Sequence, residues 1–197
     1  MKVLLATDIF GKTNAVETFR ERLNTVYERV LILDPYDAKQ MSFQGENEAY
    51  EVFMQTCGFE NYAKLCQKTL DVLRGEEVIL IGFSMGASAL WRVLDGRKEG
   101  TIKHFYGFYA SQIRHFLDAN PCVPCTLIFP DSEPHFDVEA LMSKLATKES
   151  LTCIKTAYLH GFMNPLSVNY DAKGYAEYCR WIEESINSSP LSTSYKS

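Results

Sequence analysis

The chain has 197 residues, of which 46% are hydrophobic and 13% aromatic, and its formal net charge is −5. This length is close to that of one domain, and the apolar content is too high for a disordered chain. The charge offers no basic footprint for nucleic acid and no polybasic patch for a membrane surface, so we expect neither partner.

No apolar stretch of the sequence approaches the ~20 residues of a membrane span. The apolar run that follows Met1 and Lys2 is too short for a secretion signal, and we interpret it as the first core strand. Without such a signal the six cysteines are expected as free thiols in a cytoplasmic protein. Cys122 and Cys125 have C-x-x-C spacing, but no second pair or histidine cluster accompanies them, so we expect no metal and no cofactor.

Short apolar runs alternate with segments of helical periodicity along the chain. The runs lack polar alternation, as is typical of parallel strands covered on both faces. The expected strands are 2–7, 29–33, 77–82, 102–107, 124–129 and 153–159, and the expected helices are 13–24, 59–73, 85–95, 137–146 and 171–187. This order predicts an α/β fold with a mostly parallel, doubly wound sheet of about six strands flanked by helices, in one domain over residues 1–187. Residues 188–197 are polar and are expected as a frayed tail.

Residues 34–58 interrupt this alternation with a proline and two glycines, directly after the expected strand 29–33. In α/β sheets, ligands bind beyond the carboxyl ends of the strands. The segment is therefore expected either as a lid or pocket wall, or as a surface loop with a short helix.

The segment that carries most chemical information is G-F-S-M-G at residues 82–86, between an apolar run and a helical pattern. This is G-x-S-x-G in the strand–turn–helix context of a nucleophile elbow. Such a turn strains the serine backbone, so close neighbours must lack a Cβ, as Gly82 and Gly86 do. The turn exposes the hydroxyl beside a helix N-terminus that can stabilise an oxyanion. We predict Ser84 as a nucleophile; the alternative is a glycine-rich turn whose serine caps the helix.

A nucleophilic serine needs a base to take its proton and a carboxylate to orient that base. In sheets of this kind the acid and then the histidine follow the serine along the chain. His104 and His115 precede any acid placed after the expected strand 124–129, which leaves His135 and His160. His160 follows the last expected strand in a loop that contains glycine, and we predict it as the general base.

Three carboxylates compete for the acid position. Asp131, Glu133 and Asp137 all lie near the end of the expected strand 124–129. Each of them can instead face water or cap the next helix, and Asp137 is the best placed as its N-cap. The residues alone leave this choice open.

Four segments resemble the dienelactone hydrolase family of α/β-hydrolases, and the resemblance covers most of residues 2–186. V-L-L-A-T-D-I-F-G at residues 3–11 resembles the family's first core strand and the turn after it. V-L-I-L-D-P-Y at residues 30–36 resembles a strand with an Asp-Leu-Tyr-like ending. The segment 82–86 matches the nucleophile elbow, and H-G-F at residues 160–162 matches the histidine loop.

The resemblance implies a carboxylester hydrolase that forms an acyl-enzyme on Ser84, with His160 as the base and no cofactor. It also implies that the backbone N–H groups of Met85 and Ile9 form the oxyanion hole, each contributing roughly 3–4 kcal/mol to transition-state stabilisation. The expected partner is a small-molecule acyl substrate.

The resemblance also bears on the acid. The family's acid stands directly before a proline, and alignment on Pro134 places Glu133 in that position. Because glutamate serves as the acid in some α/β-hydrolases, Glu133 is preferred, with Asp131 as the alternative.

The chain departs from the family in several places. The namesake enzymes have a cysteine nucleophile where this chain has Ser84, and a glutamate where it has Asp8. The antiparallel strands that open the family's fold have no room before Lys2, and no arginine pair marks a dianionic substrate. Lactone chemistry therefore need not transfer to this chain.

Functions other than ester hydrolysis also fit parts of the sequence. Thioester hydrolysis or acyl transfer would use the same residues, and a non-catalytic binding protein could keep the fold. Residues 6–13, A-T-D-I-F-G-K-T, nearly spell a phosphate-binding loop. There, however, Ala6 replaces the leading glycine and Asp8 would bring negative charge towards the phosphates, so nucleotide binding is not expected.

Overall fold

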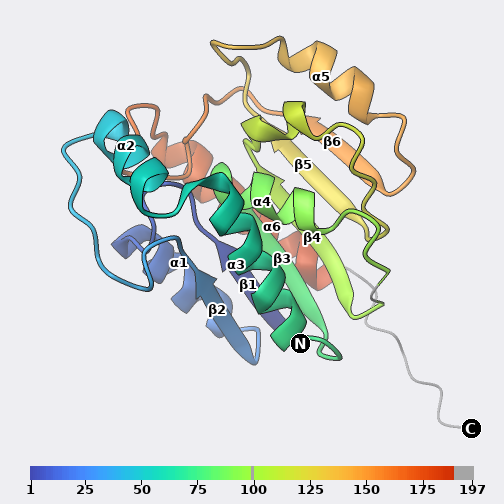
Figure 1. Cartoon of the computed structure of the whole chain (residues 1–197). Helices are drawn as coiled ribbons and strands as arrows, with labels where there is room; N and C mark the ends of the chain where they lie inside the picture. The colour runs from blue at the N-terminus through green and yellow to red at the C-terminus, as the bar shows by residue number, and fades with distance from the viewer. Residues whose placement is uncertain (99, 189–197) are drawn as a thin grey trace, which may run out of the picture.

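A parallel sheet of six strands forms the centre of the protein (Figure 1). The structure is a computed structural model that describes residues 1–98 and 100–188. The strands are β1 (Lys2–Ala6), β2 (Arg29–Leu33), β3 (Val78–Phe83), β4 (Ile102–Phe108), β5 (Cys125–Phe129) and β6 (Leu151–Lys155). Their order across the sheet is β2-β1-β3-β4-β5-β6, and every neighbouring pair is parallel, which confirms the doubly wound α/β fold.

Helices cover both faces of this sheet. They are α1 (Asn14–Asn24), α2 (Glu46–Thr56), α3 (Gly58–Val72), α4 (Met85–Val93), α5 (Val138–Leu145) and α6 (Ala172–Ser188). The strand side chains alternate between two buried layers. Leu4 and Leu80 pack with α3, α4 and α5, whereas Leu5 and Ile81 pack with α1 and α6. Within the described ranges, no helix combines the length and the apolar character needed to cross a membrane.

The last strand differs from the prediction. β6 covers residues 151–155 rather than 153–159, because Leu151 already pairs with Cys125 of β5. The strand stops where the Thr156 Oγ1 atom accepts a hydrogen bond from the Tyr158 backbone N–H at 3.1 Å, which turns the chain out of the sheet. At the other end of the predicted domain, α6 includes residue 188, and residues 189–197 of the predicted tail lie outside the described residues.

The segment 34–58 contains a helix that the sequence did not delimit, α2. Before this helix, Asp34 holds a tight turn: its Oδ1 accepts from the Tyr36 N–H at 2.8 Å and its Oδ2 from the Ala38 N–H at 3.0 Å. Asp37 and Ala38 have φ angles of 56° and 61° in this turn. The two hydrogen bonds that the Asp34 carboxylate accepts offset the backbone strain of these left-handed residues, and the turn directs the chain towards α2.

His104 makes the stability of the fold depend on pH. It lies in β4, pairs with the Thr126 hydroxyl at 2.9 Å and stacks on Tyr106, and burial lowers its pKa from 6.5 to about 4. As the pH falls, the imidazole is therefore protonated at a higher pH in the unfolded chain than in the folded one. The free energy of unfolding decreases as the pH falls from 6.5 to 4. We expect His104→Gln to remove about 2 kcal/mol of this loss, measured by urea unfolding at pH 7 and pH 4.5. Parallel pH profiles for the variant and the wild type would contradict the assignment, and His115→Gln, at an exposed position, is the matched control.

Candidate active site

Ser84 occupies a strained turn between β3 and α4, at the carboxyl edge of the sheet. Its φ and ψ are 48° and −110°, and φ values in this range are uncommon for a residue with a side chain. The backbone N–H of Ser84 donates to the Phe108 carbonyl at the end of β4, at 2.9 Å. The neighbouring strand thus holds the turn in a conformation that an isolated segment would avoid.

The two glycines of the turn are required by close contacts. A Cβ on Gly82 would lie 2.5 Å from Ala87 Cα, and a Cβ on Gly86 would lie 2.4 Å from the Thr7 carbonyl oxygen. Both contacts are with backbone, which cannot rotate away as a side chain can. The turn therefore packs against the end of β1, in agreement with the elbow predicted from the sequence.

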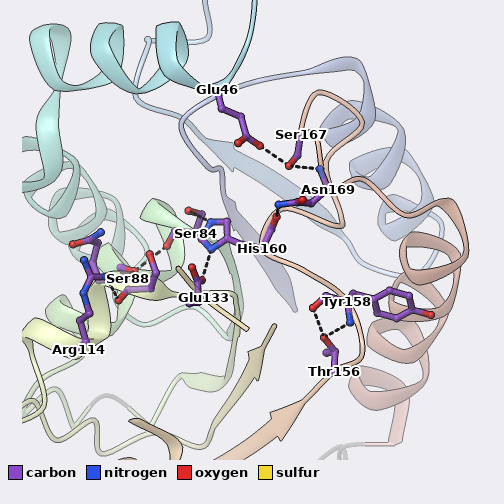
Figure 2. A network of polar contacts seen from close by, with 12 residues as sticks. Glu46, Ser84, Ser88, Arg114, Glu133, Thr156, Tyr158, His160, Ser167 and Asn169 are labelled. Atoms are coloured by element: carbon purple, nitrogen blue, oxygen red, sulfur yellow. Dashed lines mark hydrogen bonds and ion pairs between the residues drawn. The ribbon is translucent and has the colours of Figure 1, made fainter. Parts of the chain in front are cut away.

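A continuous series of hydrogen bonds links Ser84, His160 and Glu133 (Figure 2). The Ser84 Oγ lies 2.9 Å from His160 Nε2, and His160 Nδ1 lies 2.6 Å from Glu133 Oε1. Because an ionised carboxylate only accepts, Nδ1 carries the ring proton of the neutral imidazole and Nε2 is left to accept from the serine. The Glu133 side chain is only 7% exposed, against 30% for His160. This arrangement suits proton transfer from the hydroxyl to the ring.

The other acids and histidines lie outside this series. Asp131 points to solvent with 58% of its side chain exposed, and its Oδ1 lies 3.6 Å from Lys155 Nζ. Asp137 caps α5 by accepting from the Ala140 N–H at 3.0 Å, as predicted. His135 is exposed on the rim of the cavity described below. Of the three carboxylates left open by the sequence, the structure brings Glu133 to the imidazole.

The loop after β1 is braced beside the serine. The Tyr36 hydroxyl donates to the Ile9 carbonyl at 2.6 Å, and Asp8 Oδ1 accepts from the Phe10 N–H at 2.9 Å. Ile9 and Met85 both line the cavity that Ser84 faces, and Met85 begins α4, where backbone N–H groups have no partner within the helix. The expectation that these two residues donate to an oxyanion stays a prediction.

Asp8 links this loop to the loop that carries His160. Its Oδ2 accepts from Asn164 Nδ2 at 2.7 Å. Burial raises the pKa of the Asp8 carboxyl, and the bond from Asn164 opposes this shift. No motif or spacing in the sequence singles out Asn164, because a lone amide in a loop has no pattern.

A cavity of about 330 Å³ opens above the serine. Its walls come from the loop after β1, the β3–α4 turn, the His160 loop and the first turns of α2, where Glu46, Asn47 and Tyr50 line it. The segment 34–58 therefore forms a pocket wall that contains a helix. The cavity lining includes the carboxylates of Asp8, Glu46 and Glu133 and, among the described residues, no lysine or arginine.

The C-x-x-C pair shows no arrangement typical of a ligand pair. Cys125 is buried in β5, whereas Cys122 is exposed before it. In residues 1–98 and 100–188, no three His, Cys, Asp or Glu side chains gather as metal ligands do.

Comparisons with known proteins agree with this architecture. No family model matches the sequence. A relative, the uncharacterised protein YczH of Bacillus subtilis strain 168, is 29% identical over 180 residues, which cover 86% of this chain and 84% of YczH. A dienelactone hydrolase-like promiscuous phosphotriesterase, P91, from metagenomic libraries superimposes with a TM-score of 0.65 over 93% of this chain and 85% of its own, at 16% identity. The chain has the α/β-hydrolase fold.

A second structure of this α/β-hydrolase fold, the dienelactone hydrolase of Anabaena variabilis, has a TM-score of 0.61 at 17% identity and covers 93% of this chain and 85% of its own. Both solved structures are thus of the kind that the sequence resemblance indicated. At such low identity the likeness concerns the fold, and the chemistry must be argued from the site itself.

The close approach at Gly86 predicts a strong effect of one added methyl group. We expect Gly86→Ala to lower the free energy of unfolding by about 2–3 kcal/mol, because its Cβ would overlap the backbone at the end of β1. Gly100→Ala is the matched control, since nothing lies within 4 Å of its added Cβ. Urea unfolding of the two variants checks this, and equal midpoints would show that α4 can move away from β1.

Proposed function

We propose that this protein is a serine hydrolase of small carboxylic esters or related acyl compounds, acting through an acyl-enzyme on Ser84. The observation that carries the proposal is the hydrogen-bonded series from the Ser84 hydroxyl through His160 to the buried Glu133, at distances of 2.9 and 2.6 Å. A strained backbone at the serine and a cavity directly above it support the same proposal.

The geometry supports the following steps. His160 Nε2 takes the Ser84 proton while Oγ attacks the substrate carbonyl carbon, and the resulting oxyanion accepts from the N–H groups of Met85 and Ile9. The imidazolium then gives its proton to the departing alkoxide, which leaves as an alcohol. A water molecule then attacks the acyl-enzyme while His160 takes a proton from the water. The imidazolium returns this proton to Ser84 Oγ, and the carboxylic acid product is released. Glu133 holds the imidazole in the required tautomer and stabilises its charged form.

The cavity suggests the substrate class. A volume of about 330 Å³ lies at the small end of ligand pockets, so short acyl and alcohol groups fit best. Glu46 places a carboxylate in the wall, and no lining lysine or arginine among the described residues opposes it. An acyl group without negative charge is therefore the better substrate, because a carboxylate there would meet like charge in a partly desolvated site.

Covalent labelling with a fluorophosphonate tests the nucleophile and the base. We expect the probe to form an adduct on Ser84 in the wild type and no adduct in Ser84→Ala. In His160→Ala we expect hydrolysis of a short uncharged aryl ester to fall by at least ~10³-fold. His115→Ala, a histidine exposed outside the cavity, is the control and should keep wild-type turnover. Equal ester turnover by wild type and Ser84→Ala would overturn the enzyme proposal and favour a binding protein.

The choice of acid predicts a ranking of two substitutions that each remove one negative charge. Glu133→Gln should lower kcat by at least about 100-fold, because the amide no longer stabilises the imidazolium. Asp131→Asn should leave kcat within about twofold, because its carboxylate is exposed near Lys155 and makes little difference there. Steady-state kinetics on the same ester measures both, and the reverse ranking would make Asp131 the acid.

A further inference from the structure

The loop that carries His160 is tied to α2 by three hydrogen bonds in series, which we call the Glu46 strut (Figure 2). Glu46 Oε1 accepts from the Ser167 hydroxyl at 2.5 Å. The Ser167 oxygen accepts from the Asn169 backbone N–H at 3.2 Å, and Asn169 Nδ2 donates to the His160 carbonyl at 2.9 Å. The strut thus connects the first residue of α2 to the main chain of the base.

The chemistry of these groups fixes the direction of every bond. Ser167 has a single hydroxyl proton, which goes to Glu46, so its oxygen is free to accept from Asn169. A carboxylate acceptor shortens and strengthens such a bond. Ser167 is 7% exposed, and it fits only because residue 161 is glycine: a Cβ there would lie 2.4 Å from Ser167 Oγ. The strut is therefore a directional contact whose central hydroxyl, that of Ser167, is buried.

The Glu46 strut holds the backbone of His160, whereas the other contacts described above hold its ring. Ser84 and Glu133 hold the two ring nitrogens, and the Tyr109 ring lies 4.9 Å from the imidazole. These contacts orient the ring, whereas the bond from Asn169 holds the backbone carbonyl. A displaced backbone would move Nε2 away from the hydroxyl, and small misplacements of reacting groups are costly in rate.

We propose that Glu46 is a positioning residue for His160, acting through Ser167 and Asn169, so that the placement of α2 determines how well the base is aligned. This inference rests on the proposed function, since it takes His160 as the base. Tyr50, one turn further along α2, lines the same cavity. A substrate that contacts this wall is therefore linked to the base by the same helix.

A second set of hydrogen bonds should keep the His160 loop folded when the Glu46 strut is removed. Asn164 binds Asp8 at 2.7 Å, and the Asn164 and Ser167 backbone N–H groups donate to the Gly161 and Asn164 carbonyls within the loop. These contacts do not involve Glu46. Variants of Glu46 should therefore fold, and their kinetics should report alignment.

The test measures kcat and KM on p-nitrophenyl acetate for Glu46→Ala, Ser167→Ala and the double variant. We expect kcat to fall about tenfold or more in each single variant with KM within about twofold, and the double variant to be no slower than the singles. Glu46→Gln keeps an acceptor oxygen and should recover most of kcat. Glu48→Ala, in the same turn of α2, removes a carboxylate that accepts from the Gln44 N–H and does not line the cavity, and it should match wild type.

Single variants with kcat within twofold of Glu48→Ala, or effects that multiply in the double variant, would overturn the proposal. Proton NMR of the His160 Nδ1–H, assigned with His160→Gln, gives a readout that needs no activity. Its exchange with water should be several-fold faster in Glu46→Ala than in Glu48→Ala, and equal rates would also overturn the strut. If wild type hydrolyses no ester but the exchange rates differ, the proposed function fails while the strut stands.

Discussion

The close packing of the β3–α4 turn against the end of β1 is the constraint on which the rest of the site depends. Gly86 leaves no room for a side chain beside the Thr7 carbonyl, so α4 starts directly over the sheet. This proximity brings Ser84 and the loop after β1 to the same edge. The strained backbone of Ser84 is then held by its bond to Phe108 and by Ser88, whose backbone N–H and hydroxyl both donate to the Ser84 carbonyl. Such backbone strain persists because the surrounding contacts over-determine the conformation.

The His160 ring is positioned by a different principle, because residue 160 lies in neither a helix nor a strand. His160 lies in a long connection between β6 and α6, and polar side chains from distant elements fix that connection. Asp8 binds it from the end of β1, and Glu46 binds it from the start of α2. Both anchors are carboxylates, so the cavity becomes acidic as a by-product of holding the loop. The electrostatic preference of the site and its rigidity thus have a common origin in the same side chains.

The sequence was informative where function depends on local backbone demands. G-x-S-x-G between an apolar run and a helical pattern was enough to locate the turn of Ser84, because residues 82 and 86 lie too close to other backbone to carry a Cβ. Chain order excluded His104 and His115, and the place of His160 after the last expected strand, in a loop that contains glycine, favoured it over His135. Glu133 and Asp131 are two residues apart, and their orientations depend on how the chain leaves β5, which residue type alone does not encode; the family resemblance was needed to prefer Glu133.

Other features had no signal in the sequence. Glu46, Ser167 and Asn169 act through hydrogen bonds between segments far apart in the chain, and such contacts have no period or motif. The end of β6 was misplaced because the apolar run continues past the residue where the Thr156 hydroxyl turns the chain. The helix α2 was also not delimited, because its start at Gly45 has no side-chain cap.

The order of the strands has a consequence for how the protein folds. The hydroxyl and the imidazole that meet at the site are 76 residues apart, and Glu133 lies between them in the chain, in the loop after β5. Contacts at such sequence separation form late, since the intervening chain must be ordered first. While the C-terminal strand β6 is not yet docked, the Ser84 hydroxyl lacks its hydrogen bond with the His160 ring. The hydrogen bond between Ser84 and His160 therefore forms late in folding, and its presence reports that the C-terminal strand has docked.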